Sequence, residues 1–220
     1  MTTNHYKAVI FDLDGTLLDT VQDIANSMNN VLERHGFPLH DIASYRRFIG
    51  NGISKLVYRA LPSEISEGVH YNKILAEVID EYSRNFDVYT RLYDGIGELL
   101  SELTQRGISL AILSNKDDSF MSEVVATYLS QWKFEVVFGA RANTPAKPDP
   151  YSALEIAEIM GLQPTEFLFL GDTSVDMLTA NSAGMYAVGA AWGFRGREEL
   201  YANGARLVID CPVDLLQLLQ

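Results

Sequence analysis

Short apolar runs recur along the chain and are separated by longer stretches with helical spacing. The runs are rich in β-branched and aromatic residues and are continuously apolar, which is typical of strands covered on both faces. The stretches between them can connect parallel strands. The pattern predicts a doubly wound, Rossmann-like α/β fold with a parallel sheet. The predicted strands are 7–12, 109–114, 134–138, 167–171, 185–190 and 206–210, and the predicted connecting helices are 95–106, 119–129, 151–160 and 175–183.

The interval between the first two predicted strands departs from this alternation of strands and helices. It holds about ninety residues without a convincing strand, which is too many for one crossover connection. Its apolar positions have helical spacing over 20–36, 40–60 and 66–86. We therefore predict an inserted helical domain, residues 18–87, within a core domain formed by residues 1–17 and 88–220.

Composition and charge narrow the class of protein. Hydrophobic residues make up 47% of the 220 residues and charged residues 21%, as in ordinary globular proteins. The net charge of −12 disfavours nucleic acid and anionic membranes as partners. The apolar run at 8–11 is too short for a signal peptide or a membrane span. The single cysteine, Cys211, excludes a disulfide framework and is expected to be buried. We expect a cytoplasmic protein that is a monomer or a homodimer.

Polar residues gather where three of the predicted strands end. Ligands of open parallel sheets bind beyond the carboxyl ends of the strands, so these residues would meet if the strands are neighbours. Four carboxylates at one edge then require a compensating cation. Oxygen ligands favour a hard divalent ion, most plausibly Mg²⁺. The residues at these strand ends are Asp12, Asp14, Thr16, Ser114, Asn115, Asp172 and Asp176.

A metal ion held by carboxylates points to phosphoryl chemistry, because the ion screens a phosphate from an acidic protein. Within the pair Asp12 and Asp14, one carboxylate could attack phosphorus. The other, held protonated, could donate a proton to the leaving oxygen and later activate water. Ser114 and Asn115 could donate hydrogen bonds to the transferring oxygens, and Thr16 is a further candidate phosphate ligand.

Lys147 is the candidate cation of this site. Pro148 keeps it out of helical geometry, so its ammonium could act as a point charge between nucleophile and phosphate. Four carboxylates and one lysine sum to −3, which Mg²⁺ changes to −1 and a protonated Asp14 to about zero. A site of that charge would accept a phosphate.

Each motif also has a purely structural interpretation. Thr173 and Asp176 can form a helix capping box, and Lys147 alone could be a solvated turn residue. Asp12-x-Asp14-Gly could be an acidic turn, and Ser114-Asn115 could simply end a strand and cap a helix. The coincidence of all four motifs at strand ends favours a functional site.

The four motifs, in this order, resemble those of the haloacid dehalogenase superfamily. The motifs are Asp12-Leu-Asp14-Gly15-Thr16, Ser114-Asn115, Lys147-Pro148 and Gly171-Asp172-x-x-x-Asp176. The helical insertion resembles the superfamily's cap, and the whole chain most resembles the phosphoglycolate-phosphatase-like members. The resemblance implies that Asp12 is the nucleophile of a phosphoaspartyl intermediate and Asp14 the general acid and base. It further implies Mg²⁺ bound by Asp12, the Asp14 carbonyl and Asp172, with Asp176 in or near the metal shell.

The resemblance extends to the segment 48–52 of the insertion, which is similar to a substrate-facing cap loop. It implies that Gly50, Asn51 and Gly52 help to select the substrate. Candidates for binding a second anionic group of that substrate are Arg46, Arg47 and Lys55.

The sequence thus predicts a Mg²⁺-dependent phosphatase acting on a small phosphorylated metabolite, with phosphoglycolate as the leading candidate. A phosphomutase of the β-phosphoglucomutase type would use the same nucleophile and remains an alternative. A regulatory phospho-acceptor of receiver type is another alternative, although the long insertion speaks against it. A pseudo-enzyme is the third, although every expected catalytic position is filled.

Overall fold

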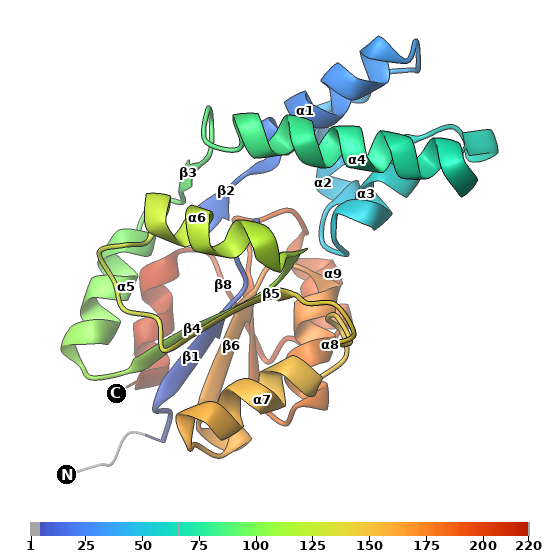
Figure 1. The fold of residues 1–220 in the computed structure, drawn as a ribbon. Helices are drawn as coiled ribbons and strands as arrows, with labels where there is room; N and C mark the ends of the chain where they lie inside the picture. Colours follow the sequence, from blue (N-terminus) through green and yellow to red (C-terminus); the bar gives the residue numbers. More distant parts are fainter. Residues whose placement is uncertain (1–4, 66, 220) are drawn as a thin grey trace. The chain divides into compact units, whose positions relative to one another are not determined.

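The computed structural model describes residues 5–65 and 67–219 and contains a six-stranded parallel sheet (Figure 1). The strand order is β5-β4-β1-β6-β7-β8. The predicted doubly wound α/β fold is therefore confirmed. The strands are β1 (Ala8–Phe11), β4 (Ser109–Asp117), β5 (Val136–Ala140), β6 (Phe167–Gly171), β7 (Tyr186–Ala190) and β8 (Leu207–Ile209).

β1 is the central strand, and its position determines where ligands can bind. Val9 pairs with Leu110 of β4 on one side and with Leu168 of β6 on the other. The chain first adds β4 and β5 on one side of β1 and then crosses over to add β6, β7 and β8 on the other. The carboxyl ends of β1, β4 and β6 therefore meet where the strand order reverses, which is the usual ligand position in such sheets.

Helices cover both faces of this sheet (Figure 1). One face packs against α7 (Tyr151–Met160), α8 (Ser174–Ser182) and α9 (Arg197–Ala202) in a continuous apolar core. On the other face α5 (Ile96–Gln105) packs against β4 and against the 3₁₀ helix η3 (Pro212–Leu219). α6 (Asp118–Tyr128) follows β4 directly and contacts β5. Both faces of the sheet are thus buried, which explains the continuously apolar strands.

Three local predictions differ from the structure. β4 extends three residues past its predicted end at 114, because pairing with β5 resumes at Asp117 after an irregularity. β5 begins two residues later than predicted, since its first paired residue is Val136. Cys211 is exposed rather than buried, because it lies in the turn that follows β8.

The chain divides into two compact units. The first contains the residues up to Leu18 and those from Leu92 onward, and the second is Asp19–Arg91. The sequence predicts the insertion over 18–87. A short two-stranded sheet, β2 (Leu18–Asp19) with β3 (Arg91–Leu92), lies where the chain leaves the first unit and returns to it; the sequence pattern does not predict it.

The second unit is helical, with apolar faces of α1 and α4 packed together. The stretch 40–60, whose apolar positions have helical spacing, forms two helices that flank a break at residues 49–52. Gly50 and Gly52 have φ angles of 116° and 84°, which belong to a backbone conformation that a continuous helix excludes. The helices are α1 (Val21–Arg34), α2 (Ile42–Phe48), α3 (Ile53–Ala60), the 3₁₀ helix η1 (Ser63–Ile65) and α4 (Gly68–Asn85).

Among the described residues, no helix combines the length and the apolar character that crossing a membrane requires.

Candidate active site

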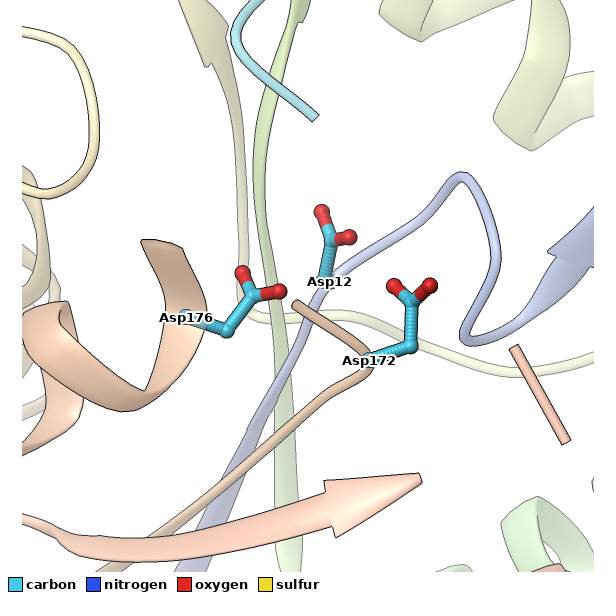
Figure 2. Close-up of side chains that lie close together, drawn as sticks. All are labelled: Asp12, Asp172 and Asp176. Carbon is cyan, nitrogen blue, oxygen red and sulfur yellow. The ribbon is translucent and has the colours of Figure 1, made fainter. Parts of the chain in front are cut away.

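Three buried aspartates converge at the carboxyl edge of the sheet. Asp12 follows β1, Asp172 follows β6 and Asp176 lies in the first turn of α8 (Figure 2). Each offers a carboxylate oxygen, and these oxygens lie within 4.8 Å of one another. The predicted convergence of distant strand ends therefore holds for these three acids.

Lys147 is buried beside two of them. Its Nζ donates hydrogen bonds to Asp12 Oδ1 at 2.8 Å, to Asp176 Oδ1 at 2.7 Å and to the Leu113 carbonyl at 2.8 Å. These three bonds use all three ammonium hydrogens. The interpretation of Lys147 as a solvated turn residue is therefore wrong.

Burial shifts the proton affinities of this cluster. It raises the pKa of Asp12 to about 7, with a further contribution from the negative charge of Asp176 and an opposing one from Lys147. Burial also raises the pKa of Asp172 well above its ordinary value, with contributions from Asp12 and Asp176. Burial alone would lower the pKa of Lys147. The negative charges of the adjacent Asp12 and Asp176 outweigh this effect, so the pKa of Lys147 is raised. The carboxylates are thus held in an environment that is short of positive charge.

The donor set fits a hard divalent cation. Three carboxylates and one ammonium sum to −2, which one divalent ion would balance. The donors are all oxygens, as Mg²⁺ prefers. Asp12 Oδ1 is engaged with Lys147, whereas its Oδ2 accepts no hydrogen bond from the part of the chain that the structure describes. Asp12 and Asp172 could therefore hold the ion directly.

Hydrogen bonds fix Asp172 on both sides. Thr16 Oγ1 donates to Asp172 Oδ1 at 3.1 Å, and the Phe194 amide donates to Oδ2 at 2.7 Å. Thr16 is predicted to bind phosphate, but in the structure its hydroxyl is turned toward Asp172. This hydrogen bond orients a candidate metal ligand, and the binding of phosphate by Thr16 stays a prediction.

Asp176 combines two roles that the sequence presents as alternatives. Its Oδ2 accepts hydrogen bonds from the Thr173 amide at 3.0 Å and the Thr173 hydroxyl at 2.7 Å, which completes a capping box at the start of α8. Its Oδ1 meanwhile lies 2.7 Å from Lys147 Nζ. The cap therefore places this acid inside the cluster.

Ser114 and Asn115 lie at the predicted strand end but make different contacts. The Asn115 amide bonds both the amide and the carbonyl of Lys147, each at 3.0 Å, and so fixes the backbone of that lysine. The Ser114 hydroxyl accepts a hydrogen bond from the Lys116 amide at 3.1 Å, which leaves its own proton to donate. Asn115 thus positions the backbone of Lys147, and the binding of phosphate by Ser114 and Asn115 stays a prediction.

Asp14 has a partner that the sequence interpretation missed. Lys116 Nζ lies 3.0 Å from Asp14 Oδ1 and 3.2 Å from Oδ2. The predicted charge count, with one lysine against four carboxylates, is wrong because Lys116 supplies a second positive charge. Four carboxylates and two lysines sum to −2 without a protonated Asp14. The sequence feature that could have identified Lys116 as a site residue is its position directly after Ser114-Asn115 at a strand end.

The predicted specificity residues all belong to the second unit. Arg46 and Arg47 are exposed on α2, and Lys55 is exposed on α3 with its Nζ 5.7 Å from the Tyr58 ring centroid. Gly50, Asn51 and Gly52 form the break between these helices. Arg59, which the sequence interpretation does not single out, donates to the Phe48 carbonyl at 2.7 Å and to Asn51 Oδ1 at 2.8 Å. The role of this loop in substrate selection stays a prediction.

Comparisons with known proteins show which family this chain is similar to. The sequence model for the haloacid dehalogenase-like hydrolases matches residues 9–190. A phosphoglycolate phosphatase of Pseudomonas putida is 33% identical over 212 residues, covering 93% of this chain and 76% of the relative. The enzyme of that name from Vibrio vulnificus is 32% identical over 221 residues, covering 98% and 97%.

Solved structures show the same similarity. A protein described as a predicted phosphoglycolate phosphatase from Haemophilus somnus has a TM-score of 0.91 at 26% identity, over all of both chains. A second, described as a putative phosphoglycolate phosphatase from Lactobacillus delbrueckii, has a TM-score of 0.90 at 26% identity and covers 97% of this chain and 98% of its own. By the family match and the shared sequence over nearly its whole length, the chain belongs to the haloacid dehalogenase-like hydrolases.

Proposed function

We propose that this protein is a Mg²⁺-dependent phosphatase that hydrolyses a small phosphorylated metabolite through a phosphoaspartyl intermediate on Asp12. The observation that carries the proposal is the buried cluster of Asp12, Asp172 and Asp176 with Lys147, whose formal charge of −2 matches a divalent ion. The names of the similar enzymes make phosphoglycolate the leading substrate candidate.

The proposed reaction has two steps that use the same aspartates. In the first, Asp12 Oδ2 attacks phosphorus while the bond to the ester oxygen breaks, and Asp14, which enters this step in its protonated form, gives that oxygen a proton. In the second, Asp14 takes a proton from a water molecule whose oxygen attacks phosphorus, and Asp12 is released. Lys147 fixes Asp12 through Oδ1, so that the attacking oxygen has one orientation. The bound Mg²⁺ would screen the phosphate from the surrounding carboxylates.

Phosphate release from p-nitrophenyl phosphate tests the proposal. The wild-type protein is expected to turn over with Mg²⁺ and to stop with EDTA. Asp12→Asn should abolish turnover, whereas Asp87→Asn, at an exposed acid outside the cluster, should retain it. Mass spectrometry of acid-quenched wild-type enzyme should detect one added phosphoryl group, which Asp12→Asn should lack. Full turnover by Asp12→Asn would refute the assignment of the nucleophile.

The substrate is tested separately with a panel of esters. Phosphoglycolate, sugar phosphates, nucleotides and pyrophosphate should be compared at fixed Mg²⁺. A hundredfold preference in kcat/KM, about 2.7 kcal/mol, would identify a dedicated substrate. If the loop around Asn51 selects that substrate, Asn51→Ala and Arg46→Ala should raise its KM and leave p-nitrophenyl phosphate unaffected. Product analysis with a sugar phosphate distinguishes hydrolysis from transfer to the sugar, as in a phosphomutase.

A further inference from the structure

Lys116 and Asp14 form a largely buried ion pair, and no step of the proposed reaction uses Lys116. The Lys116 side chain is 6% exposed and that of Asp14 13%, so the pair is unlike a solvated surface salt bridge. The two contacts from Lys116 are the only side-chain hydrogen bonds that Asp14 accepts within the described part of the chain. The orientation of the Asp14 carboxyl group therefore depends on Lys116.

The fold directs Lys116 to this place through an irregularity in β4. Leu113 pairs with Phe138 of β5, and the next paired residue, Asp117, is opposite Ala140. Four residue steps in β4 thus correspond to two in β5, so residues 114–116 leave the regular ladder. Such bulges change the direction of side chains and are common beside active sites.

The irregular segment of β4 packs closely against Gly139 of β5, where a side chain would not fit. A Cβ atom at Gly139 would lie 2.7 Å from the Lys116 carbonyl oxygen and 2.6 Å from the Asp118 Cα, both backbone atoms that cannot move aside easily. The Gly139 amide also donates to Asp118 Oδ1 at 2.8 Å, directly after the irregular segment. The position of the Lys116 backbone is therefore constrained by the close approach of Gly139 in β5.

The two lysines of the site have separate partners. Lys147 contacts Asp12 and Asp176, whereas Lys116 contacts Asp14. A general acid must present its proton along one direction to the departing oxygen, and an error of about 1 Å can reduce the rate by about a hundredfold. Lys116 Nζ contacts both oxygens of Asp14, at 3.0 and 3.2 Å, and so fixes the plane in which the carboxyl group lies.

We propose that Lys116 is a positioning residue that aims the Asp14 carboxyl group at the leaving oxygen. The inference rests on the proposed function, because it takes Asp14 to be the proton donor. It predicts that losing Lys116 slows the reaction most for substrates whose leaving oxygen needs a proton. It also predicts that Lys116 acts only through Asp14.

Two aryl phosphates of similar shape, whose aryl groups carry no second anionic group, provide the test. p-Nitrophenol leaves readily as an anion, whereas phenol depends more on protonation. Lys116→Met should lower kcat/KM for phenyl phosphate by about a hundredfold and for p-nitrophenyl phosphate by less than about fivefold. Lys116→Arg should restore part of the loss. Lys133→Met, at an exposed lysine paired with Glu135, is the matched control and should match wild type on both esters.

A mutant cycle tests whether Lys116 acts through Asp14. Adding Lys116→Met to Asp14→Asn should change kcat/KM for phenyl phosphate by less than about twofold, because the group to be positioned is already lost. Independent losses that multiply would overturn the inference. Equal losses on the two aryl esters would also overturn it, as would a rise in KM confined to phosphoglycolate, which would make Lys116 an anchor for the substrate carboxylate.

Crystal structures of wild type and Lys116→Met give a readout that does not depend on turnover. The inference expects the Asp14 carboxyl group to move or to become disordered in the variant while Asp12 and Asp172 stay in place. An unchanged Asp14 would overturn it. A wild-type protein without phosphatase activity would instead refute the proposed function, and the crystallographic comparison would still decide whether Lys116 holds Asp14.

Discussion

Removing divalent metal should make the stability of this protein depend on pH in a direction set by the buried cluster. The pKa of Asp12 is about 7 in the folded protein against an ordinary value of 3.8, so the folded state binds this proton more tightly than the unfolded state. Stability is then greatest below the ordinary value and declines as the pH rises through about 7, because the buried carboxylate must ionise. The raised pKa of Asp172 acts in the same direction.

The size of the effect follows from the shift. Between about pH 5.5 and pH 7 the Asp12 proton alone should remove about 1 to 2 kcal/mol from the free energy of unfolding. For a domain of this size that corresponds to a fall of about 3 to 6 °C in Tm. Bound Mg²⁺ should cancel the decline, because it binds the ionised carboxylates and stabilises the folded state.

Thermal unfolding in EDTA and in excess Mg²⁺, at both pH values, measures this coupling. The Tm increase caused by Mg²⁺ should be larger at pH 7 than at pH 5.5. Asp172→Asn is the control, because it removes one buried charge and should raise the metal-free Tm at pH 7 while reducing the response to Mg²⁺. A metal-free Tm that is constant across this range, or a Mg²⁺ response equal at both pH values, would refute the reasoning.

Three further substitutions test contacts around and outside the cluster. Asn115→Ala removes both hydrogen bonds to the Lys147 backbone and should lower the free energy of unfolding by about 1 to 3 kcal/mol in urea titrations, together with a reduced kcat. Thr16→Val removes the bond to Asp172 Oδ1 and should raise the Mg²⁺ concentration for half-maximal activity about tenfold, which Thr16→Ser should not. Asp23→Ala, in α1, removes a buried carboxylate that accepts the amides of residues 89 and 90, and should destabilise the protein by about 2 to 3 kcal/mol in the same titrations without changing KM.

The position of the site in the fold can be predicted from the sequence, whereas most hydrogen bonds within the site cannot. That Asp12 and Asp172 meet follows from two local properties, continuously apolar strands and acids at their carboxyl ends, together with the rule for parallel sheets. The partners of Thr16 and Asn115 do not follow from such properties. Their hydrogen bonds reach residues 156 and 32 positions away, and side-chain directions past a strand end depend on the loop that each strand enters.

Lys116 was missed for a related reason. In a regular strand, alternation would place successive side chains on opposite faces and give no reason to pair Lys116 with Asp14. The irregular pairing of β4 with β5 changes that direction, and it depends on a strand about twenty residues further along the chain. Likewise, the break at Gly50 and Gly52 divides a stretch whose apolar spacing fits one helix, because the spacing carries no information on φ.

The arrangement of charges explains why stability and function should oppose each other here. Lys116 is paired with Asp14 and Lys147 bridges Asp12 and Asp176, which leaves Asp172 without a basic partner among the described residues. Thr16 and Phe194 satisfy its hydrogen-bonding capacity but not its charge. With both lysines in place, the four carboxylates and two ammonium groups sum to −2. One divalent ion would neutralise that charge without displacing either lysine. The same deficit that destabilises the metal-free protein is therefore what should recruit the ion, and a variant that neutralises Asp172 should gain stability only by giving up that recruitment.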